Sequence, residues 1–398
     1  MIRVLAVTDA AEVCGTEHSL LNLAEKLLSA DVEMTLAARG GRSLEQRWRA
    51  LGLPFQVVAL PSRRGFRPST GKGYHGITEL SRLPYRTLLA VRRIIRTTWV
   101  VRPEIIHSSC LMTHFDCAAA GMITRTPSVL ELHDIVAPGV GRLMMGVAVR
   151  LSGRAIAVSS AVKNQLPRWA RSRVVVIPQG IDTDRFDVDD GPGQWRRQLT
   201  SEPDCTLVAA IGRIDPEKNL HVLIRAVAIA REAGANLHLA LVGAPSKDNG
   251  TYREELKALG QELLPGAFRM LPQVEDVPGV LRSTDVLVCP SVEEPFGLIL
   301  LEAQACRVPV VASAAGGPRE FIAHGRTGML VLSNDPLGYA DALQRLVHDP
   351  RLREQIAREG RARVRTSYSA EARAQKVMSL YRQIGAGREA TAIRMGAT

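Results

Sequence analysis

The chain has 398 residues, of which 46% are hydrophobic and 23% charged, and a formal net charge of +11. This composition excludes a largely disordered chain, and the length predicts two domains of roughly 150–200 residues. No apolar run approaches the ~20 residues of a membrane-spanning helix, and the start lacks a signal-peptide pattern. The six cysteines form no CxxC pair, so we expect reduced thiols and a cytoplasmic location.

The positive charge is concentrated in the first half of the chain. Residues 1–187 carry 25 Lys and Arg against 15 Asp and Glu, whereas residues 188–398 carry 26 against 25. A basic half suits an anionic partner such as membrane lipid or a phosphorylated substrate. An Arg-rich but merely solvated surface is the alternative. Nucleic acid is not expected as a partner, because this half has few aromatic residues and no binding motif.

Short apolar strands alternate with helical stretches along the first half. The expected strands are 3–8, 32–38, 55–60, 104–109, 128–133, 155–159 and 174–178, and the expected helices are 19–29 and 85–99. Strands that alternate with helices predict a doubly wound parallel sheet. The segment 1–187 is therefore expected to be one α/β domain.

The same pattern restarts after a Gly- and Asp-rich stretch at 187–195, the expected linker. Strands are expected at 206–212, 237–243, 268–271, 286–290, 308–313 and 328–332, with a helix at 220–234. The segment 188–369 is thus a second α/β domain, and 370–398 a last helix, near 370–384, with a flexible tail. Ligands bind at the carboxyl ends of parallel strands, so we expect both domains to face one cleft.

Two junctions between a strand and a helix carry polar groups suited to an anion. In "AEVCGTEHSLL", Gly15 allows close approach of the backbone and Thr16 is expected to cap the helix, although a plain turn explains both. In "IGRIDPEKN", Arg213 and Lys218 directly follow a buried strand and could clamp a diphosphate. The alternative is two solvated cations, with Lys218 paired to Asp215 or Glu217.

Acids flank the apolar run of "EEPFGLILLEAQA". Glu294 falls in a loop and Glu302 within the helix that follows, with Gly297 near the helix start. A buried carboxylate is costly unless it accepts hydrogen bonds, and the hydroxyls of a sugar or ribose are suitable donors. The two acids are therefore interpreted as holding a polyhydroxylated ligand. A solvated Glu302 and a simple capping loop are the alternatives.

Taken together, these motifs resemble the retaining family 4 glycosyltransferases of the GT-B fold, which has two Rossmann-like domains. The segment "EEPFGLILLEA" fits the family pattern E-x-F-G-x-x-x-x-E-A, and "GRIDPEKN" fits G-R-x-x-x-x-K-N. The segments "VIPQGID", "VSSAVKNQL", "GGPREFI" and "HGRTGMLV" also match, in the family's order. The resemblance extends over nearly the whole chain, and it implies that the C-terminal helix crosses back to the first domain.

The resemblance implies a nucleotide-sugar donor, favours UDP, and assigns roles to matching residues. Arg213 and Lys218 would bind the diphosphate, Glu294 the donor sugar and Glu302 the ribose, while His133 would lie beside the sugar. The implied catalytic set is Arg213, Lys218, Glu294 and His133. The implied donor-binding set is Gly15, Thr16, Gly212, Arg213, Lys218, Val274, Glu294, Phe296, Gly297, Leu298 and Glu302.

Departures from the family pattern leave parts of this assignment open. Cys14 stands where the family often has Gly, and Pro272 and Gln273 differ from the usual glycine of the base-binding loop, so the nucleobase stays open. No carboxylate cluster demands a metal, and no cofactor is expected. The expected reaction is a hexosyl transfer by a front-face path without metal. A nucleotide-sugar 2-epimerase, or a coupling-type relative that transfers no sugar, remains an alternative.

The acceptor is expected on the basic first domain. Arg63, Arg64 and Arg67 lie in a Gly-rich loop, and Arg82, Arg86, Arg92, Arg93 and Arg96 follow. They favour a phosphorylated acceptor or peripheral association with an anionic membrane at its inner face. An ordinary helix that covers the sheet, with its arginines in water, is the alternative.

Overall fold

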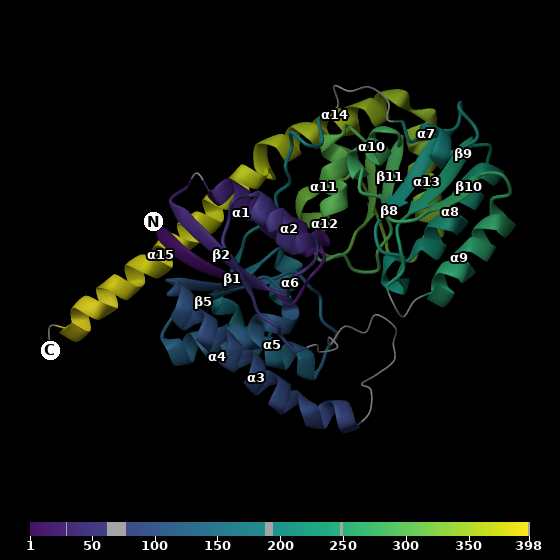
Figure 1. Ribbon diagram of the computed structural model, residues 1–398. Helices are drawn as coiled ribbons and strands as arrows, with labels where there is room; N and C mark the ends of the chain where they lie inside the picture. The colour runs from purple at the N-terminus through teal and green to yellow at the C-terminus, as the bar shows by residue number, and fades with distance from the viewer. Residues whose placement is uncertain (29, 62–76, 188–193, 247–249, 397–398) are drawn as a thin grey trace. The chain divides into compact units, whose positions relative to one another are not determined.

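The computed structural model describes residues 1–28, 30–61, 77–187, 194–246 and 250–396 (Figure 1). These residues divide into two compact units. The first contains the described residues up to 180 together with those from 370 onward, and the second those from 181 to 369. The second unit thus begins at Ile181, before the expected boundary after 187, and most of the expected linker lies outside the described residues.

The first unit is built on a seven-stranded parallel sheet of order β3-β2-β1-β4-β5-β6-β7. Its strands are β1 (Ile2–Val7), β2 (Val32–Ala38), β3 (Phe55–Val57), β4 (Ile105–Ser108), β5 (Ser128–Leu132), β6 (Arg154–Ala157) and β7 (Val174–Val176). Register pairs Ala6 of β1 with Leu36 of β2 and His107 of β4. The order reverses at β1, so the loops after β1 and β4 flank the point where ligands of such sheets bind.

Helices cover both faces of this sheet (Figure 1). On one face lie α1 (Gly15–Leu27), α2 (Ser43–Ala50) and α15 (Ala370–Gly396), and on the other α3 (Ile77–Val101), α4 (His114–Thr124) and α5 (Val140–Leu151). The short helix α6 (Ser160–Asn164) follows β6, and 3-10 turns occupy Leu111–Thr113 and Arg168–Arg173. Leu20 of α1 and Leu380 of α15 belong to one apolar core with Met34 of β2.

The second unit has a six-stranded parallel sheet of order β10-β9-β8-β11-β12-β13. Its strands are β8 (Thr206–Ile211), β9 (Leu237–Val242), β10 (Phe268–Leu271), β11 (Val286–Cys289), β12 (Val310–Ser313) and β13 (Met329–Val331). Its helices are α7 (Arg196–Leu199), α8 (Leu220–Glu232), α9 (Gly250–Leu263), α10 (Val277–Arg282), α11 (Leu298–Ala305), α12 (Pro318–Phe321), α13 (Pro336–His348) and α14 (Pro350–Ser367). A 3-10 turn at Pro216–Lys218 precedes α8.

The central strands of both sheets are mostly apolar and buried because helices cover both faces of each sheet. In β9, the run "LHLALV" is buried at every position, and apolar residues from α8 and α13 fill one side of the sheet. A smaller apolar cluster that includes Leu199 and Val280 covers the other side of the sheet. The predicted pair of doubly wound Rossmann-like domains is confirmed.

The last helix is longer than expected. A helix near 370–384 was expected, whereas α15 runs from Ala370 to Gly396. The apolar residues Val377, Leu380 and Tyr381 bury the first turns of this helix in the first unit, and a helix once nucleated extends at low cost. In the described part of the chain, no helix has the length and hydropathy to cross a bilayer.

Candidate functional site

The polar junctions of the second unit gather at one edge of its sheet. Strands β8, β11 and β12 are neighbours, and all run in parallel. Arg213 and Lys218 follow β8, Glu294 follows β11, and Gly316 follows β12. Because parallel strands end at the same edge, the three loops meet there, and the amide of Val292 donates to the carbonyl of Glu217 at 2.9 Å.

Arg213 is held by two acids from its own loop. Its Nη1 donates to Asp215 Oδ2 at 2.6 Å and its Nη2 to Glu217 Oε1 at 2.7 Å. Asp215 is fully buried and also accepts from Ser246 Oγ at 2.6 Å. The Arg213 side chain remains 45% exposed, so the acids orient the guanidinium while it keeps N–H donors for a ligand.

Lys218 pairs with Glu294, and not with Asp215 or Glu217 of its own loop as the alternative interpretation had it. Its Nζ lies 2.7 Å from Glu294 Oε2. Burial disfavours the Lys218 ammonium, but the Glu294 carboxylate outweighs burial and raises the Lys218 pKa. Burial likewise opposes the charge on Glu294, and Lys218 outweighs it and lowers the Glu294 pKa. Both groups are therefore charged at neutral pH.

The donors that reach Glu294 all contact the same oxygen. Oε2 accepts from Lys218, from Ser291 Oγ at 2.8 Å and from the thiol of Cys289 at 3.7 Å. Within the described residues, no hydrogen bond reaches Oε1. A buried carboxylate with one anchored oxygen and one open oxygen is suited to accept a ligand hydroxyl.

Glu302 lies on α11, and no donor among the described residues contacts its carboxylate. Burial raises its pKa to about 7, and Arg185 opposes that shift only in part. An ionised group that lacks a partner is costly, and hydroxyl donors from a ligand would relieve the cost. The acids at the two ends of this apolar segment therefore differ: Glu294 is anchored and Glu302 is not.

Glycines allow the loops around Glu294 to approach each other. Gly297, with φ 99°, precedes α11, and its N-cap position has no side-chain cap. Gly316 has φ 69°, and a Cβ there would lie 2.1 Å from the Glu294 carbonyl oxygen. The amide of Gly317 donates to that oxygen at 2.8 Å. The backbone of the 316–317 pair thus sets the position of Glu294.

The remaining predicted residues of the second unit surround this edge. Gly212 has φ 145° at the end of β8. Phe296 is buried and its ring lies 5.3 Å from that of Phe321, while Leu298 begins α11 half-buried. Val274 packs against a small apolar cluster with Trp195. Phe296 therefore supports the loop from within.

The expected cap of α1 in the first unit is wrong. The helix begins at Gly15, so Cys14 is the N-cap residue and Thr16 lies within the first turn. Glu17, the third residue of the helix, returns to the N-cap as in a capping box, because its carboxylate accepts from the Cys14 amide at 3.3 Å. Burial raises the pKa of Glu17. A Cβ at Gly15 would meet nothing within 4 Å, so the space beside its backbone is open.

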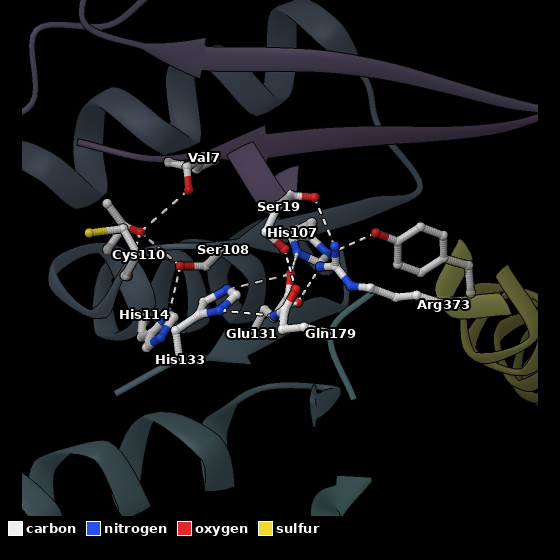
Figure 2. Close-up of polar contacts among 12 residues, drawn as sticks. Val7, Ser19, His107, Ser108, Cys110, His114, Glu131, His133, Gln179 and Arg373 are labelled. Atoms are coloured by element: carbon white, nitrogen blue, oxygen red, sulfur yellow. Dashed lines mark hydrogen bonds and ion pairs between the residues drawn. The ribbon is translucent and has the colours of Figure 1, made fainter. Parts of the chain in front are cut away.

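His133 follows β5 and belongs to a buried polar network, drawn in Figure 2. Its Nδ1 lies 3.1 Å from Gln179 Nε2, which also donates to Glu131 Oε1 at 3.3 Å. Glu131 Oε2 lies 3.0 Å from His107 Nε2, and Arg373 of α15 pairs with Oε1. Burial opposes the charge on Glu131, but Arg373 holds its pKa well below the usual value.

Several residues of these two clusters carried no motif signal. Ser291 and Cys289 contact Glu294, and Asp215 orients Arg213, but each is an ordinary residue of a strand end or loop. Glu131 did offer a signal, since an acid inside the apolar strand "SVLEL" requires a partner. Arg373 offered none, because its partner lies 242 residues away in the sequence.

Comparison with known protein families matches both halves of the chain. Residues 13–185 match glycosyltransferase family 4, and residues 193–363 match glycosyl transferases group 1. D-inositol 3-phosphate glycosyltransferase of Actinosynnema mirum is 39% identical over 193 residues, 47% of this chain and 46% of that one. The chain spans about half the length of this relative. Alpha-maltose-1-phosphate synthase of Mycolicibacterium smegmatis is 32% identical over 313 residues, 71% of this chain and 79% of that one.

Solved structures share the fold of nearly the whole chain. Anabaena HepE in complex with UDP-glucose has a TM-score of 0.80 at 22% identity and covers 96% of this chain and 100% of its own. Sucrose-phosphate synthase of Thermosynechococcus elongatus has a TM-score of 0.76 at 21% identity and covers 97% and 100%. At sequence identities of 21–22%, this similarity shows a shared fold only.

Proposed function

We propose, from the premise that this chain belongs to the family 4 glycosyltransferases of the GT-B fold, that it moves a hexose from a UDP-sugar to an acceptor hydroxyl with retention of configuration. Sugar transfer is the activity of the family. The donor, the stereochemistry and the role of each residue are inferred from the site. The observation that carries them is the juxtaposition of Lys218 with Glu294, whose second oxygen is open, on the loop before the helix that carries Glu302.

The chemistry of the second unit supports a nucleotide-sugar donor. Arg213 and Lys218 supply positive charge for a diphosphate, and the open oxygen of Glu294 suits a sugar hydroxyl. The unpartnered Glu302 suits the ribose hydroxyls, with Val274 beside the base and Gly212, Phe296, Gly297 and Leu298 forming the loop walls. UDP as the nucleotide is favoured by the neighbour HepE, whose structures hold UDP and UDP-glucose.

The proposed mechanism relies on positioning and charge. The bond between the sugar carbon and the β-phosphate oxygen breaks as the acceptor oxygen approaches the same face, and the acceptor proton passes to the leaving phosphate. Arg213 and Lys218 stabilise the negative charge that develops on this phosphate. Glu294 accepts from a sugar hydroxyl and so fixes the ring relative to the cations. His133, Gly15 and Thr16 of the first unit are assigned to the sugar and phosphate on the family resemblance alone.

The first test is a thermal-shift panel of the unaltered protein with UDP, GDP, ADP, dTDP and NAD, all in EDTA. A ligand at 100 times its Kd should stabilise the protein by about 2.7 kcal/mol, which is readily measured. We expect UDP to stabilise it most. Stabilisation by NAD alone would overturn the donor assignment, and stabilisation by another nucleotide would replace UDP. Transfer is then tested with UDP-hexoses and acceptors that include phosphorylated polyols, since one relative named above is a D-inositol 3-phosphate glycosyltransferase.

We further propose that the first unit associates with anionic membrane through α3. Its exposed positions recur at helical spacing and mix cationic, aromatic and apolar side chains: Arg82, Tyr85, Leu88, Arg92, Arg96 and Trp99. The opposite face, with Ala90, Val91 and Ile94, is buried. Arg beside Tyr and Trp is the chemistry of a helix at the membrane interface. Arg63, Arg64 and Arg67, which the sequence analysis joined to this surface, lie outside the described residues.

Vesicle flotation tests this association. We expect the protein to float with anionic vesicles at low salt and not with neutral ones, because screening weakens such contacts. Replacing both Arg92 and Arg96 by Glu should abolish flotation, whereas Arg351→Glu, at an exposed position of α14, should not. Absence of flotation with anionic vesicles removes the proposal and leaves the transferase assignment untouched.

A further inference from the structure

The C-terminal helix places two polar side chains inside the first unit. Arg373 is 3% exposed and Tyr381 is fully buried, although both lie on α15, far along the chain from the sheet that they contact. Arg373 pairs with Glu131 and also donates to the Ser19 carbonyl at 2.8 Å. The hydroxyl oxygen of Tyr381 lies 2.7 Å from His107 Nδ1. Packing of α15 alone would need only apolar residues, so this polar contact requires another explanation.

Glu131 determines how the amide of Gln179 is oriented. The carboxylate is ionised and can only accept hydrogen bonds, so the Gln179 atom that faces Glu131 Oε1 must be the donor, Nε2. The reverse orientation would place the amide oxygen against a carboxylate oxygen. Ser19 then donates to Gln179 Oε1 on the other side. Every polar atom of the Gln179 amide is engaged.

The orientation of Gln179 in turn determines the tautomer of His133. Gln179 Nε2 donates to His133 Nδ1 at 3.1 Å, so Nδ1 must be unprotonated and the ring proton lies on Nε2. His133 Nε2 is 3.7 Å from Glu131 Oε2, too far for a hydrogen bond, and has no hydrogen-bond partner among the described residues. The ring is thus fixed at one nitrogen and keeps an unused N–H donor at the other.

We propose that Glu131 and Gln179 are positioning residues for His133, and that Arg373 holds Glu131 in place for this purpose. This inference rests on the role proposed above for His133. Through the Ser19 contacts, the same network braces α1, which carries Gly15 and Thr16. In this proposal the C-terminal helix α15 helps to position His133 in addition to packing on the sheet of the first unit.

The tautomer is tested without any assay of activity. Nitrogen-15 spectra of the histidine rings are recorded at about pH 8, where an ordinary imidazole is neutral. The His133 signals are identified by their loss in His133→Asn. We expect a bare Nδ1 and a protonated Nε2. A proton on Nδ1 overturns the proposal, whatever the outcome for sugar transfer.

The coupling is tested by double-mutant cycles on kcat. Gln179→Leu should lower kcat on the order of 10-fold with little change in the KM for the donor, and have no further effect in a His133→Asn background. Arg373→Lys, which keeps the charge, should behave in the same way. Gln56→Leu and Lys376→Met, at exposed positions of β3 and α15, serve as controls and should leave kcat unchanged. If the effects on kcat add in the two cycles, Gln179 and Arg373 do not act through His133 and the proposal is overturned. If the unaltered protein transfers no sugar at all, the proposed function is refuted instead.

Discussion

At the scale of single residues, the two glutamates of "EEPFGLILLEAQA" differ in how burial is offset. Glu294 is ionised because Lys218 and Ser291 contact one of its oxygens. Glu302 has no such partner among the described residues, and burial raises its pKa to about 7. The protein therefore carries a destabilising charge at a position where a ligand hydroxyl could compensate it. Stability and ligand affinity should respond in opposite directions when this charge is removed.

We predict that Glu302→Gln stabilises the protein at pH 8 and weakens UDP binding. The pKa rises from 4.5 in the unfolded chain to about 7 in the folded one. The folded state therefore keeps a proton that the unfolded state loses, so stability falls as pH rises from about 4.5 to 7. Glu302→Gln should therefore increase the free energy of unfolding by about 3 kcal/mol above pH 7, and this increase should vanish below pH 4.5. Urea unfolding across this pH range measures it.

The matching prediction for the ligand has the opposite sign. Binding of UDP to the unaltered protein should weaken as pH falls through about 7, because a protonated Glu302 accepts ribose hydroxyls poorly. Glu302→Gln should bind weakly at every pH. Glu232→Gln, at an exposed position of α8, is the control for both measurements. Calorimetric titration that finds pH-independent affinity in the unaltered protein would contradict the ribose assignment.

The two cations should act mainly on the chemical step. We predict that Arg213→Ala and Lys218→Ala each lower kcat on the order of 100-fold and raise KM less, because the charge that they stabilise develops only in the transition state. Steady-state kinetics measure both constants, with Arg225→Ala on the exposed face of α8 as control. Lys218→Ala also leaves Glu294 buried without its ammonium, so thermal melts must accompany it. Unchanged kcat in both variants would contradict their roles.

At the scale of elements, the site depends on loops that follow neighbouring strands. The loop after β11 carries Glu294, and the loop after β12 carries the Gly316–Gly317 pair that contacts its backbone. The segments "EEPFGLILLEA" and "GGPREFI" identified the two loops separately. Their contact follows from the adjacency of β11 and β12 in the sheet, which no local pattern specifies.

We predict that Gly316→Ala destabilises the protein and removes UDP binding. An alanine at φ 69° is strained, and its Cβ would lie 2.1 Å from the Glu294 carbonyl oxygen, so the loop with Glu294 must shift. Gly325→Ala is a matched control, since φ is 72° and its Cβ meets nothing within 4 Å. Gly325→Ala should lower the free energy of unfolding by about 1 kcal/mol from backbone strain alone. Gly316→Ala should lower it by about 2 kcal/mol more. Equal costs in denaturant unfolding would show that the contact is unimportant.

At the scale of the whole molecule, the proposed donor site relies on the side-chain cations Arg213 and Lys218 for the positive charge that many transferases take from a metal. Across the residues that the structure describes, no group of three or more His, Cys, Asp or Glu side chains could hold a metal ion. The positive charge near the proposed diphosphate comes from Arg213 and Lys218. The chain as a whole carries a net charge of +11, with the excess in the first half.

We predict that transfer proceeds at the same rate in EDTA and in Mg²⁺. The reason is that Arg213 and Lys218 supply the stabilisation of the leaving diphosphate that a divalent cation would otherwise provide. Initial rates with the unaltered protein after extensive dialysis against chelator measure this. A loss of rate in EDTA that Mg²⁺ or Mn²⁺ restores would contradict the metal-independent mechanism.

The sequence by itself determined the two α/β repeats, nearly all strands, and the loops that carry the candidate residues. These features are local: apolar runs of strand length, helical spacing, and glycines and polar residues directly after strands. The tertiary structure alone decided which partners Lys218 and Arg373 contact. Lys218 meets Glu294 across 76 residues and Arg373 meets Glu131 across 242, because sheet order and the return of α15 bring them together. Such pairings depend on how whole helices and strands pack, so local sequence patterns cannot predict them.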